Sequence, residues 1–348
     1  MKKYKEHLIH ESVPVKEALL KLDRLASDAI LFVVDENDCL IGSLTDGDVR
    51  RGLIKNFNTS DNVKKFIQEH PKLIHKENYK IDKIIEFRKN NYKIIPIVDN
   101  NNKIINVINF RLQKSYLPLD AVVMAGGMGS RLMPLTENTP KPLLMVGEKT
   151  IIDHNIDRLQ KFGIDDYWLS VRYLGKQLES HFGDGRSRNV NFKYIWEDEP
   201  LGTIGAVSKI SDFKHDYILV TNSDILTNLD YEDFFLDFIK KGADMSVVTI
   251  PYTVNIPYAV METSNNHVIS FKEKPTYTYY SNGGIYLIKK SILNRIPKKT
   301  FYNSTDLMQD LIENDGKLVS YPLRQYWLDI GKHEDYKQAQ EDIKHIKL

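Results

Sequence analysis

The stretch VVMAGGMGSRLMPLTENTPKPLL, from Val122 to Leu144, decides how the rest of the chain is interpreted. Its apolar beginning predicts a buried strand, which runs directly into Gly126, Gly127 and Gly129. Glycine lets a backbone take left-handed angles and pass close to a ligand, and successive free N–H groups form a concave anion site. The stretch therefore predicts a strand that ends in a phosphate-binding loop.

Two cations follow this loop. Arg131 comes two residues after the last glycine, and Lys141 stands between Pro140 and Pro142, which restrict the backbone on both sides of it. The loop lacks the Gly-Lys-Ser/Thr ending of a P-loop, and Leu132 stands where a dinucleotide-binding loop has its last glycine. Two positive charges beside bound phosphates suit phosphoryl transfer, in which negative charge must be stabilised.

The whole segment resembles the signature of the nucleotidyltransferases that make nucleoside-diphosphate sugars: Gly-Gly-x-Gly-x-Arg-Leu-x-Pro-Leu-Thr, then Pro-Lys-Pro. The resemblance implies transfer of a nucleotidyl group to a sugar-1-phosphate, with release of pyrophosphate, in the biosynthesis of cell-surface glycans or nonulosonate-type sugars. It also implies that Arg131 and Lys141 are catalytic and contact the triphosphate. The loop residues implied to bind the nucleotide are Ala125, Gly126, Gly127 and Gly129.

Strands and helices alternate from about Asp120 onward. This alternation predicts an α/β fold whose doubly wound sheet holds ligands at the carboxyl ends of its strands. The resemblance implies a mixed, Rossmann-like sheet of the GT-A type in a catalytic domain of residues 120–348. The expected strands are 121–124, 166–170, 191–195 and 217–221, and the expected helices are 151–162, 175–182 and 204–210.

Two aspartates are the candidate metal ligands. Asp224 follows the apolar strand pattern YILVTNSD, and Asp329 follows the apolar residues of YWLD. Phosphoryl transfer from a nucleotide generally needs Mg²⁺, held by one or two carboxylates together with phosphate oxygens. Each aspartate alone fits a helix cap equally well. The resemblance implies that both bind Mg²⁺, because the family has an Asp at each of these places.

The segment EDEPLGTIGA supplies the expected nucleotide contacts outside the loop. Gly202 and Thr203 precede a predicted helix, whose N-terminus favours anions and hydrogen-bonding ligands. The segment resembles the family's Leu-Gly-Thr-x-Gly-Ala, which implies that the glycine lies against the base or sugar and that Glu197 reads the base. A carboxylate accepts two hydrogen bonds, which suits the two donors of guanine better than the single donor of uracil or thymine. GTP is therefore the favoured nucleotide.

The expected sugar-phosphate contacts come from two later segments. FKEKP resembles the family's Glu-Lys-Pro, which implies that Glu273 contacts sugar hydroxyls and that Lys274 binds the sugar phosphate. SNGGIYLI places Asn282 and Gly283 before a predicted strand, where the family's glycine makes room for the sugar. The alternative for Asn282 and Gly283 is an ordinary hairpin turn.

The first third of the chain contains the same pattern twice, a helix followed by a hairpin, with the copies about 65 residues apart. The stretch LFVVDENDCLIGSLTDGDVRRGL resembles the CBS domain, and two such domains in tandem resemble a Bateman module. This part is therefore expected to be a small α+β pair. Residues 1–58 form the first CBS domain, and residues 59–116 form a second, degenerate one.

The CBS resemblance implies a regulatory site for an adenine nucleotide in the cleft between the repeats. Thr45 and Asp48 match the residues that contact ribose in the family, whereas the second repeat, INVINFRLQK, has no Thr-Asp pair and is expected to have lost its site. The alternative is that Thr45 and Asp48 merely cap a helix. CBS pairs and these transferases both often self-associate, so a homo-oligomer is expected.

Composition excludes several other classes. The 348 residues carry a formal net charge of +1, with Lys and Arg spread along the chain, so nucleic acid is not an expected partner. No stretch approaches the roughly 18 apolar residues of a membrane span, and the N-terminus lacks the apolar core of a signal peptide. The single cysteine, Cys39, forms neither an internal disulfide nor a cysteine-based zinc site. These features indicate a cytoplasmic protein without a membrane partner.

Two alternative functions stay open at the level of sequence. The first is a non-catalytic sensor of nucleotide-sugars, against which the complete set of Arg131, Lys141, Asp224 and Asp329 argues. The second is a cytidylyltransferase that acts on a non-sugar alcohol phosphate, against which the Glu-Lys-Pro segment argues.

Overall fold

The computed structural model describes residues 3–76, 79–346 and 348. The chain divides into two compact units. One unit consists of Met1–Leu117, Gln160–Gly163 and Gly185–Val190, and the other of Pro118–Leu159, Ile164–Asp184 and Asn191–Leu348. Within the described residues, no helix combines the length and the apolar character needed to cross a membrane.

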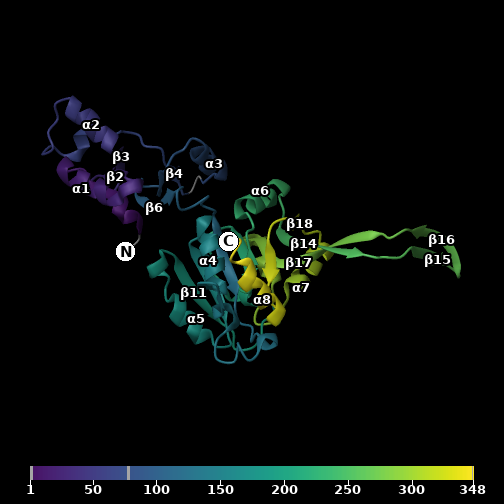
Figure 1. Cartoon of the computed structure of the whole chain (residues 1–348). Coiled ribbons are helices and arrows are strands. Elements are labelled where there is room, and N and C mark those ends of the chain that lie inside the picture. The colour runs from purple at the N-terminus through teal and green to yellow at the C-terminus, as the bar shows by residue number, and fades with distance from the viewer. Residues whose placement is uncertain (1–2, 77–78, 347) are drawn as a thin grey trace. The chain divides into compact units, whose positions relative to one another are not determined.

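The N-terminal unit contains two three-stranded sheets of identical topology (Figure 1). In each sheet the middle strand pairs parallel with the first and antiparallel with the third. The first repeat comprises β1 (Leu8–His10), α1 (Val15–Leu25), β2 (Leu31–Val34), β3 (Leu40–Leu44) and α2 (Asp46–Ile54). The second comprises β4 (Ile74–His75), α3 (Ile81–Lys89), β5 (Ile94–Val98) and β6 (Ile104–Asn109).

The hairpins of the two repeats meet at their turns. The backbone N–H of Leu40 donates to the carbonyl oxygen of Asn102 at 2.9 Å, and the Asn102 side chain donates back to the Leu40 carbonyl at 2.7 Å. Phe32 of the first repeat and Val98 of the second belong to the same buried apolar cluster. The two repeats therefore share part of one core, as expected for an internal duplication.

The second unit is built on a seven-stranded mixed sheet in which β7 is an interior strand. The strand order is β11-β10-β7-β12-β17-β14-β18, and β17 alone runs antiparallel to its neighbours among these described strands. This arrangement confirms the predicted mixed, doubly wound sheet. The bounds are β7 (Leu119–Met124), β10 (Asp166–Val171), β11 (Asn191–Trp196), β12 (Tyr217–Asn222), β14 (Met245–Asn255), β17 (Thr276–Lys289) and β18 (Leu318–Pro322).

Helices and short ribbons surround this sheet. Leu307 and Leu311 of one helix pack against Val220 and Ile288 of the sheet in a shared apolar core. The helices are α4 (Ile151–Lys161), α5 (Gly175–Phe182), α6 (Tyr231–Lys241), α7 (Ser304–Glu313) and α8 (His333–Asp342). The two-stranded ribbons are β8 (Met145–Val146) with β9 (Lys149–Thr150), β13 (Ile225–Thr227) with β19 (Trp327–Asp329), and β15 (Val260–Ser264) with β16 (His267–Lys272).

Several short segments are 3₁₀-helical. The α-helix expected at residues 204–210 is one of them, because only η7 (Gly205–Lys209) forms there. The Ser208 hydroxyl donates to the Gly205 carbonyl at 2.7 Å, a local bond that competes with helical pairing. The others are η1 (Lys3–His7), η2 (Ala26–Asp28), η3 (Val63–Lys65), η4 (Ser130–Leu132), η5 (Lys141–Leu143), η6 (Arg186–Arg188) and η8 (Lys290–Arg295).

Residues 250–281 form an arm that projects from the sheet (Figure 1, green). The arm consists of the outer parts of β14 and β17 and of the ribbon β15–β16. Asn282 and Gly283 were expected before a strand, but both lie inside β17, where the pairing with β14 shifts by a bulge. The expectation was wrong because a bulge, like a turn, selects residues such as glycine that tolerate unusual backbone angles.

Candidate active site

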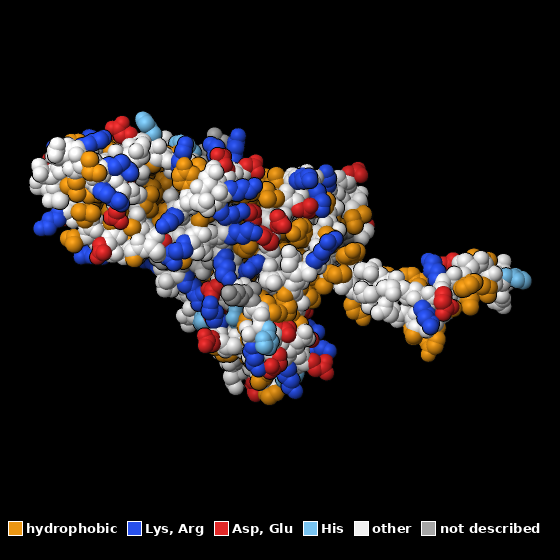
Figure 2. Space-filling view, turned by 45° about the horizontal axis from the view of Figure 1, so that its top comes forward, with side chains coloured by type: hydrophobic (Ala, Val, Ile, Leu, Met, Phe, Trp, Pro, Cys, Tyr) orange, Lys and Arg blue, Asp and Glu red, His pale blue; other side chains and the backbone are white. Residues whose placement is uncertain are grey.

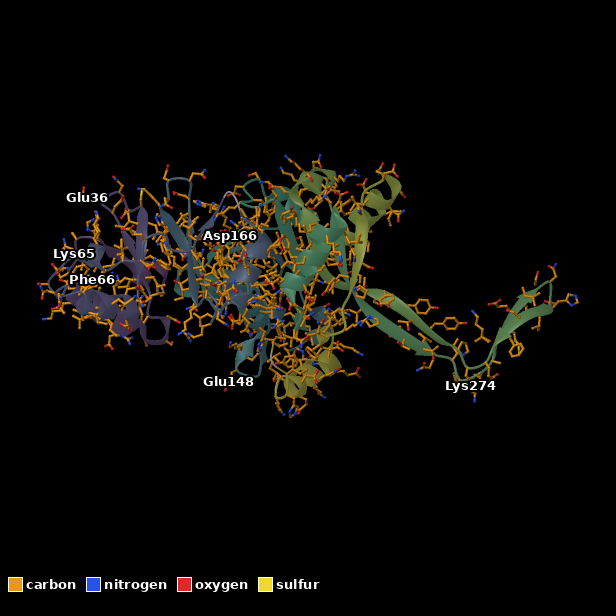
Figure 3. All side chains as sticks on the ribbon, turned by 90° about the horizontal axis from the view of Figure 1, so that it is seen from above. Glu36, Lys65, Phe66, Glu148, Asp166 and Lys274 are labelled. Carbon is orange, nitrogen blue, oxygen red and sulfur yellow. The ribbon has the colours of Figure 1, made fainter. Side chains whose placement is uncertain are left out.

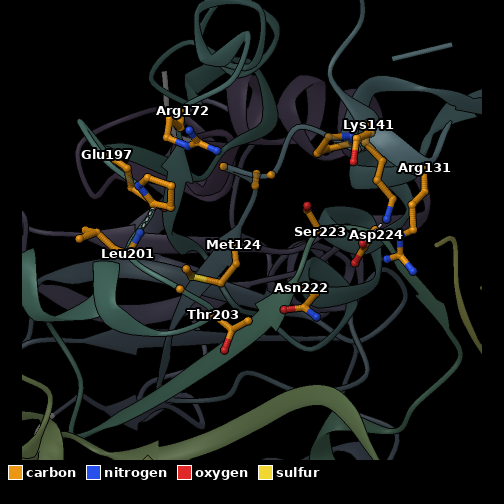
Figure 4. A pocket seen from close by; sticks show the side chains of 18 of the residues that line it. Met124, Arg131, Lys141, Arg172, Glu197, Leu201, Thr203, Asn222, Ser223 and Asp224 are labelled. Atoms are coloured by element: carbon orange, nitrogen blue, oxygen red, sulfur yellow. Dashed lines mark hydrogen bonds and ion pairs between the residues drawn. The ribbon is translucent and has the colours of Figure 1, made fainter. Parts of the chain in front are cut away.

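A cavity of about 370 Å³ opens at the carboxyl ends of β7 and β12 (Figure 4). Strands β10 and β12 flank β7 on its two sides, so the order of the strands reverses at β7. The cavity therefore lies at a topological switch point, where α/β sheets bind ligands. The predicted nucleotide, catalytic and metal residues that line it are Ala125, Gly126, Gly127, Gly129, Arg131, Lys141, Glu197, Gly202, Thr203 and Asp224.

The glycine loop forms one wall of this cavity. Gly129 has a φ of 64°, in the left-handed region, and a Cβ added there would lie 3.0 Å from the Cβ of Lys141. The Thr136 hydroxyl donates to the Gly129 carbonyl at 2.9 Å and holds the turn closed. A Cβ on Gly127 would meet no atom within 4 Å, so this part of the loop faces open space. The loop therefore leaves its backbone accessible while it packs closely against the lysine segment.

Lys141 is buried and forms an ion pair with Asp224, which comes from the end of β12. The lysine begins η5, directly after Pro140. Arg131 lies in η4 on the same side of the cavity, and Figure 4 shows its side chain beside Lys141 and Asp224. Two cations thus reach the edge of the glycine loop from neighbouring 3₁₀ turns.

The two candidate metal ligands, which are far apart in sequence, lie together in space. Strand β13 pairs antiparallel with β19 so that Ile225 lies opposite Asp329, and the backbone N–H of Ile330 donates to the Asp224 carbonyl at 3.0 Å. One side-chain oxygen of each aspartate, Oδ1, is buried without a hydrogen-bond partner. Burying a carboxylate oxygen without a partner is energetically unfavourable, and a cation bound to that oxygen would offset this cost.

Electrostatics points in the same direction. Burial raises the pKa of Asp329, and the negative charge of Asp224 raises it further. The positive charges of Lys141 and Arg131 oppose this pKa shift in part. Within the described residues no group of three or more metal-ligating side chains occurs. Two carboxylates beside a phosphate-binding loop fit Mg²⁺, because Mg²⁺ takes one or two carboxylates and completes its shell with water and substrate phosphates.

Glu197 lines the cavity from the end of β11, but its carboxylate is already engaged. The Ser170 hydroxyl donates to Oε1, and the Leu201 N–H donates to Oε2 at 3.0 Å. The residue is buried, and a Cβ on Gly126 would lie 3.0 Å from Oε1. A carboxylate has about four acceptor positions, so two remain for a base. Glu197 therefore shapes the loop that follows it in addition to any contact with a ligand.

A second cavity of about 280 Å³ adjoins the first, because Thr203 and Asn222 line both. The Thr203 hydroxyl accepts a hydrogen bond from the Ser304 N–H at 2.8 Å, which ties this loop to the start of α7. The predicted residues in the second cavity are Thr203, Asn282, Gly283 and Asp329. The structure thus joins the cavity beside the glycine loop to a second, polar one, with the two aspartates at their boundary.

Four predicted residues lie outside both cavities. Glu273 and Lys274 are exposed on the arm, away from the sheet that holds the cavities (Figure 3). Thr45 and Asp48 belong to the other compact unit and form a capping box at the start of α2. The Asp48 carboxylate accepts from the Thr45 N–H at 2.8 Å and from its hydroxyl at 2.6 Å, so capping accounts for both side chains.

Sequence reasoning missed several cavity residues. Arg172 follows β10 directly and lines the first cavity beside Gly126 (Figure 4). Asn222 and Ser223 line it at the end of β12, and Trp327 lines the second cavity. Arg172 carried the same signal as Asp224, a charged residue just past an apolar strand. Trp327 carried none, because its place depends on the pairing of β19 with β13.

Two family models match the chain. The family described as "Nucleotidyl transferase" matches residues 120–346, and the family "CBS domain" matches residues 5–55. The mannose-1-phosphate guanyltransferase of Schizosaccharomyces pombe is 31% identical over 227 residues, which are 63% of this chain and 62% of that protein. The D-glycero-alpha-D-manno-heptose 1-phosphate guanylyltransferase of Aneurinibacillus thermoaerophilus is 29% identical, over 65% of this chain and 99% of that protein.

A solved structure shows the same fold. HddC from Yersinia pseudotuberculosis, complexed with GMP-PN, aligns with a TM-score of 0.51 at 25% sequence identity. The alignment covers 64% of this chain and 99% of that one.

Proposed function

The chain belongs to the nucleotidyl transferase family, and on that premise we propose that it transfers a guanylyl group from GTP to a sugar-1-phosphate. One observation carries the proposal: a glycine loop, two cations and two aspartates with unpartnered oxygens meet at the end of one sheet. The adjoining polar hollow has room for part of a sugar. The products are a nucleoside-diphosphate sugar and pyrophosphate.

In the proposed reaction, a phosphate oxygen of the sugar-1-phosphate attacks the α-phosphorus of the nucleotide. A bond forms between them while the bond from the α-phosphorus to the bridging oxygen of the β-phosphate breaks, and pyrophosphate leaves with that electron pair. The attacking phosphate is already ionised at neutral pH, so no general base is required. Positioning and charge stabilisation then supply most of the catalysis.

The residues of the first cavity divide this work. Backbone N–H groups of the glycine loop are suited to hold the triphosphate. Arg131 and Lys141 stabilise the negative charge that develops on the phosphates. Asp224 and Asp329 would hold Mg²⁺, which when bound neutralises phosphate charge and orients the triphosphate.

Guanine is the proposed base for two reasons. The curated relatives described above are named as guanylyltransferases, and the related HddC structure was determined with GMP-PN. Glu197 lines the cavity with a buried carboxylate that keeps free acceptor positions for the N1–H and N2–H₂ donors of guanine. The identity of the sugar is left to experiment.

The N-terminal unit is proposed to bind an adenine nucleotide and to regulate the enzyme in the cytoplasm. Support comes from the CBS match over residues 5–55 and from the two repeats that share a core. Thr45 and Asp48 are the proposed ribose contacts of the first repeat. Binding there would have to compete with the capping box in which both side chains take part.

The test is pyrophosphate release in the presence of Mg²⁺. GTP, UTP, CTP, dTTP and ATP are each combined with glucosamine-, glucose-, mannose- and heptose-1-phosphate and with phosphocholine, with and without adenine nucleotides. We expect release with GTP and one sugar-1-phosphate. No release with any pair would contradict the proposal and favour the nucleotide-sugar sensor, and release only with CTP and phosphocholine would favour the non-sugar acceptor.

A further inference from the structure

The arm, residues 250–281, carries the Glu-Lys-Pro segment away from the cavities of its own chain (Figure 3). Seven consecutive residue pairs join β14 to β17, from Thr249 with Asn282 to Asn255 with Thr276. A strand advances about 3.3 Å per residue, so the six residues from Asn282 to Thr276 place the segment roughly 20 Å beyond the cavity edge. Lys274 lies further out still.

Between the sheet and the Glu-Lys-Pro segment, the arm has no break at which it could fold back onto its own cavity. The irregularity in the pairing of β14 with β17 lies at the base, between Val247 and Thr249, and the pairs from Thr249 to Asn255 are continuous. Pairing is interrupted only beyond them, at residues 256–259 and 273–275, where the Glu-Lys-Pro segment lies. A return in cis would have to break this ladder and leave its N–H and C=O groups unpaired. The paired ribbon therefore acts as a spacer, not as a hinge.

The outer part of the arm presents apolar side chains on both of its faces. Val268 and Ile269 are neighbours in β16 and so point to opposite faces, yet they are 59% and 66% exposed. Phe271 is 64% exposed on the face of Ile269, and Figure 2 shows hydrophobic and charged side chains mixed on this segment. A two-stranded ribbon that packs on nothing is marginally stable in water. This surface is thus suited to be covered by another protein surface.

The charged residues of the segment also lack partners. Among the described residues, neither Glu273 nor Lys274 has a hydrogen-bond or ion-pair partner. Lys274 has a φ of 43°, a left-handed angle that costs free energy in a residue other than glycine. The second cavity, meanwhile, has Asp329 at its edge but is lined by no lysine or arginine.

We propose that the arm docks on a second copy of this chain and that Glu273 and Lys274 complete the sugar-phosphate site of that copy. The inference rests on the proposed function, because it assigns the missing cation to the phosphate of the acceptor. Every copy has both a cavity without this cation and an arm that carries it out of reach. In a two-fold symmetric dimer, each arm would bring its lysine to the cavity of the other copy, so both cavities would gain the cation.

The decisive experiment combines two inactive variants in one dimer. Lys274→Ala removes the arm's cation, Arg131→Ala disables the core, and each is purified alone and, after co-expression with different tags, as the mixed dimer. Each variant alone is expected to lose activity at least about a hundredfold. The mixed dimer is expected to recover about half of the wild-type turnover, because one of the two sites then has an intact core and an intact arm.

The same experiment defines failure. An inactive mixed dimer would show that arm and core act within one chain. A wild-type protein that is monomeric in light scattering would also contradict the proposal, because no second copy would be present. Lys272→Ala provides the matched arm control, because Lys272 is exposed two residues away and pairs only weakly with Glu262, at 3.9 Å. This variant alone should retain wild-type activity.

A cross-link tests the docking without any turnover. Lys274→Cys is combined with Thr305→Cys, which lines the second cavity, in a chain whose native Cys39 is replaced by Ser. A short bismaleimide should join two chains into a covalent dimer, whereas docking in cis would give a cross-linked monomer and contradict the proposal. If the dimer cross-links but no substrate pair reacts, the proposed function fails and the docking stands.

Discussion

At the residue scale, the cavity depends on a balance between opposite charges. Lys141 pairs with Asp224, while Asp329 lies close to both and keeps a buried, unpartnered oxygen. Arg131 completes the set from the glycine loop side. Removing any one of these charges should therefore affect catalysis, and for the aspartates it should also affect the metal-free fold.

Arg131→Ala should lower kcat by about a hundred- to a thousandfold, because a donor aimed at developing charge contributes about 2.7–4 kcal/mol to the transition state. Steady-state pyrophosphate release measures the effect. Arg295→Ala is the matched control, since Arg295 pairs with Asp310 elsewhere on the same unit. An Arg131→Ala enzyme with near-normal turnover would contradict the assigned role.

Asp329→Asn should act in opposite directions on function and on stability. The Mg²⁺ concentration for half-maximal activity should rise about 10- to 100-fold, as for other losses around a metal site. The melting temperature of the metal-free protein should rise, because a buried negative charge beside Asp224 is removed. Asp315→Asn, at an exposed aspartate, should change neither quantity. An equal loss of activity at all Mg²⁺ concentrations would argue against metal binding.

Glu197→Gln should lower kcat/KM for GTP by about 10- to 100-fold and change that for other nucleotides less. A hydrogen bond to a charged group contributes about 1.5–3 kcal/mol, and guanine is the base with two donors to lose. Because the carboxylate also accepts from Ser170 and Leu201, the melting temperature is measured in parallel. Asp198→Asn is the control, with a side chain that is 97% exposed. An unchanged preference among nucleotides would contradict the assignment of Glu197 as the residue that recognises guanine.

At the element scale, the interior strand β7 carries a carboxyl group, that of Asp120, whose ionised form is unfavourable where it is buried. Asp120 is 1% exposed, accepts a hydrogen bond from the His215 N–H at 2.7 Å and leaves its other oxygen without a partner. Burial raises the pKa of this carboxyl to about 6. In the unfolded chain an aspartate ionises near pH 4, so folding becomes less favourable as the pH rises from about 4 to about 6.

Asp120→Asn should therefore stabilise the protein above about pH 6, by about 1–3 kcal/mol, and have little effect near pH 4. Urea unfolding of variant and wild type at both pH values measures the difference. Asp216→Asn, an exposed aspartate just before β12, should show no such pH dependence. A benefit that is equal at both pH values would contradict the role of the buried charge.

The elements also show which patterns sequence reasoning can follow. The helix α5 begins and ends at the predicted residues, 175 and 182, since its buried Leu178 and Phe182 lie on one apolar face. The stretch around η7 did not become an α-helix, because a side-chain bond inside it competes with the helical pattern. The bulge in β17 at Asn282 was mistaken for a strand start, because bulges and turns favour the same residue types.

At the scale of the whole molecule, the N-terminal unit should bind one adenine nucleotide per chain. The first repeat has Thr45 and Asp48 and the second has no such pair. Isothermal titration of the full chain with AMP, ADP and ATP measures the stoichiometry. Thr45→Ala should abolish binding, and Thr59→Ala, in an exposed loop, should not. Two nucleotides per chain, or none, would contradict the prediction.

The sequence by itself determined which local residues line the first cavity together, and it predicted their chemistry. The glycine loop, Arg131 and Lys141 lie within one short segment, so local spacing was enough to predict that they act together. Asp224 was marked by its place at the end of an apolar strand. These features are local, because a loop and the strand that feeds it are held by bonds between near neighbours.

Only the tertiary structure decided which distant residues join that segment. The pairing of β13 with β19 brings Asp329 to Asp224, and it brings Trp327 to the second cavity. The continuous pairing of β14 with β17 carries Lys274 away from the site that its motif predicted. The physical reason is that strand pairing is non-local: a motif states which chemistry a residue can perform, and the hydrogen-bonded register of the sheet determines where it is performed.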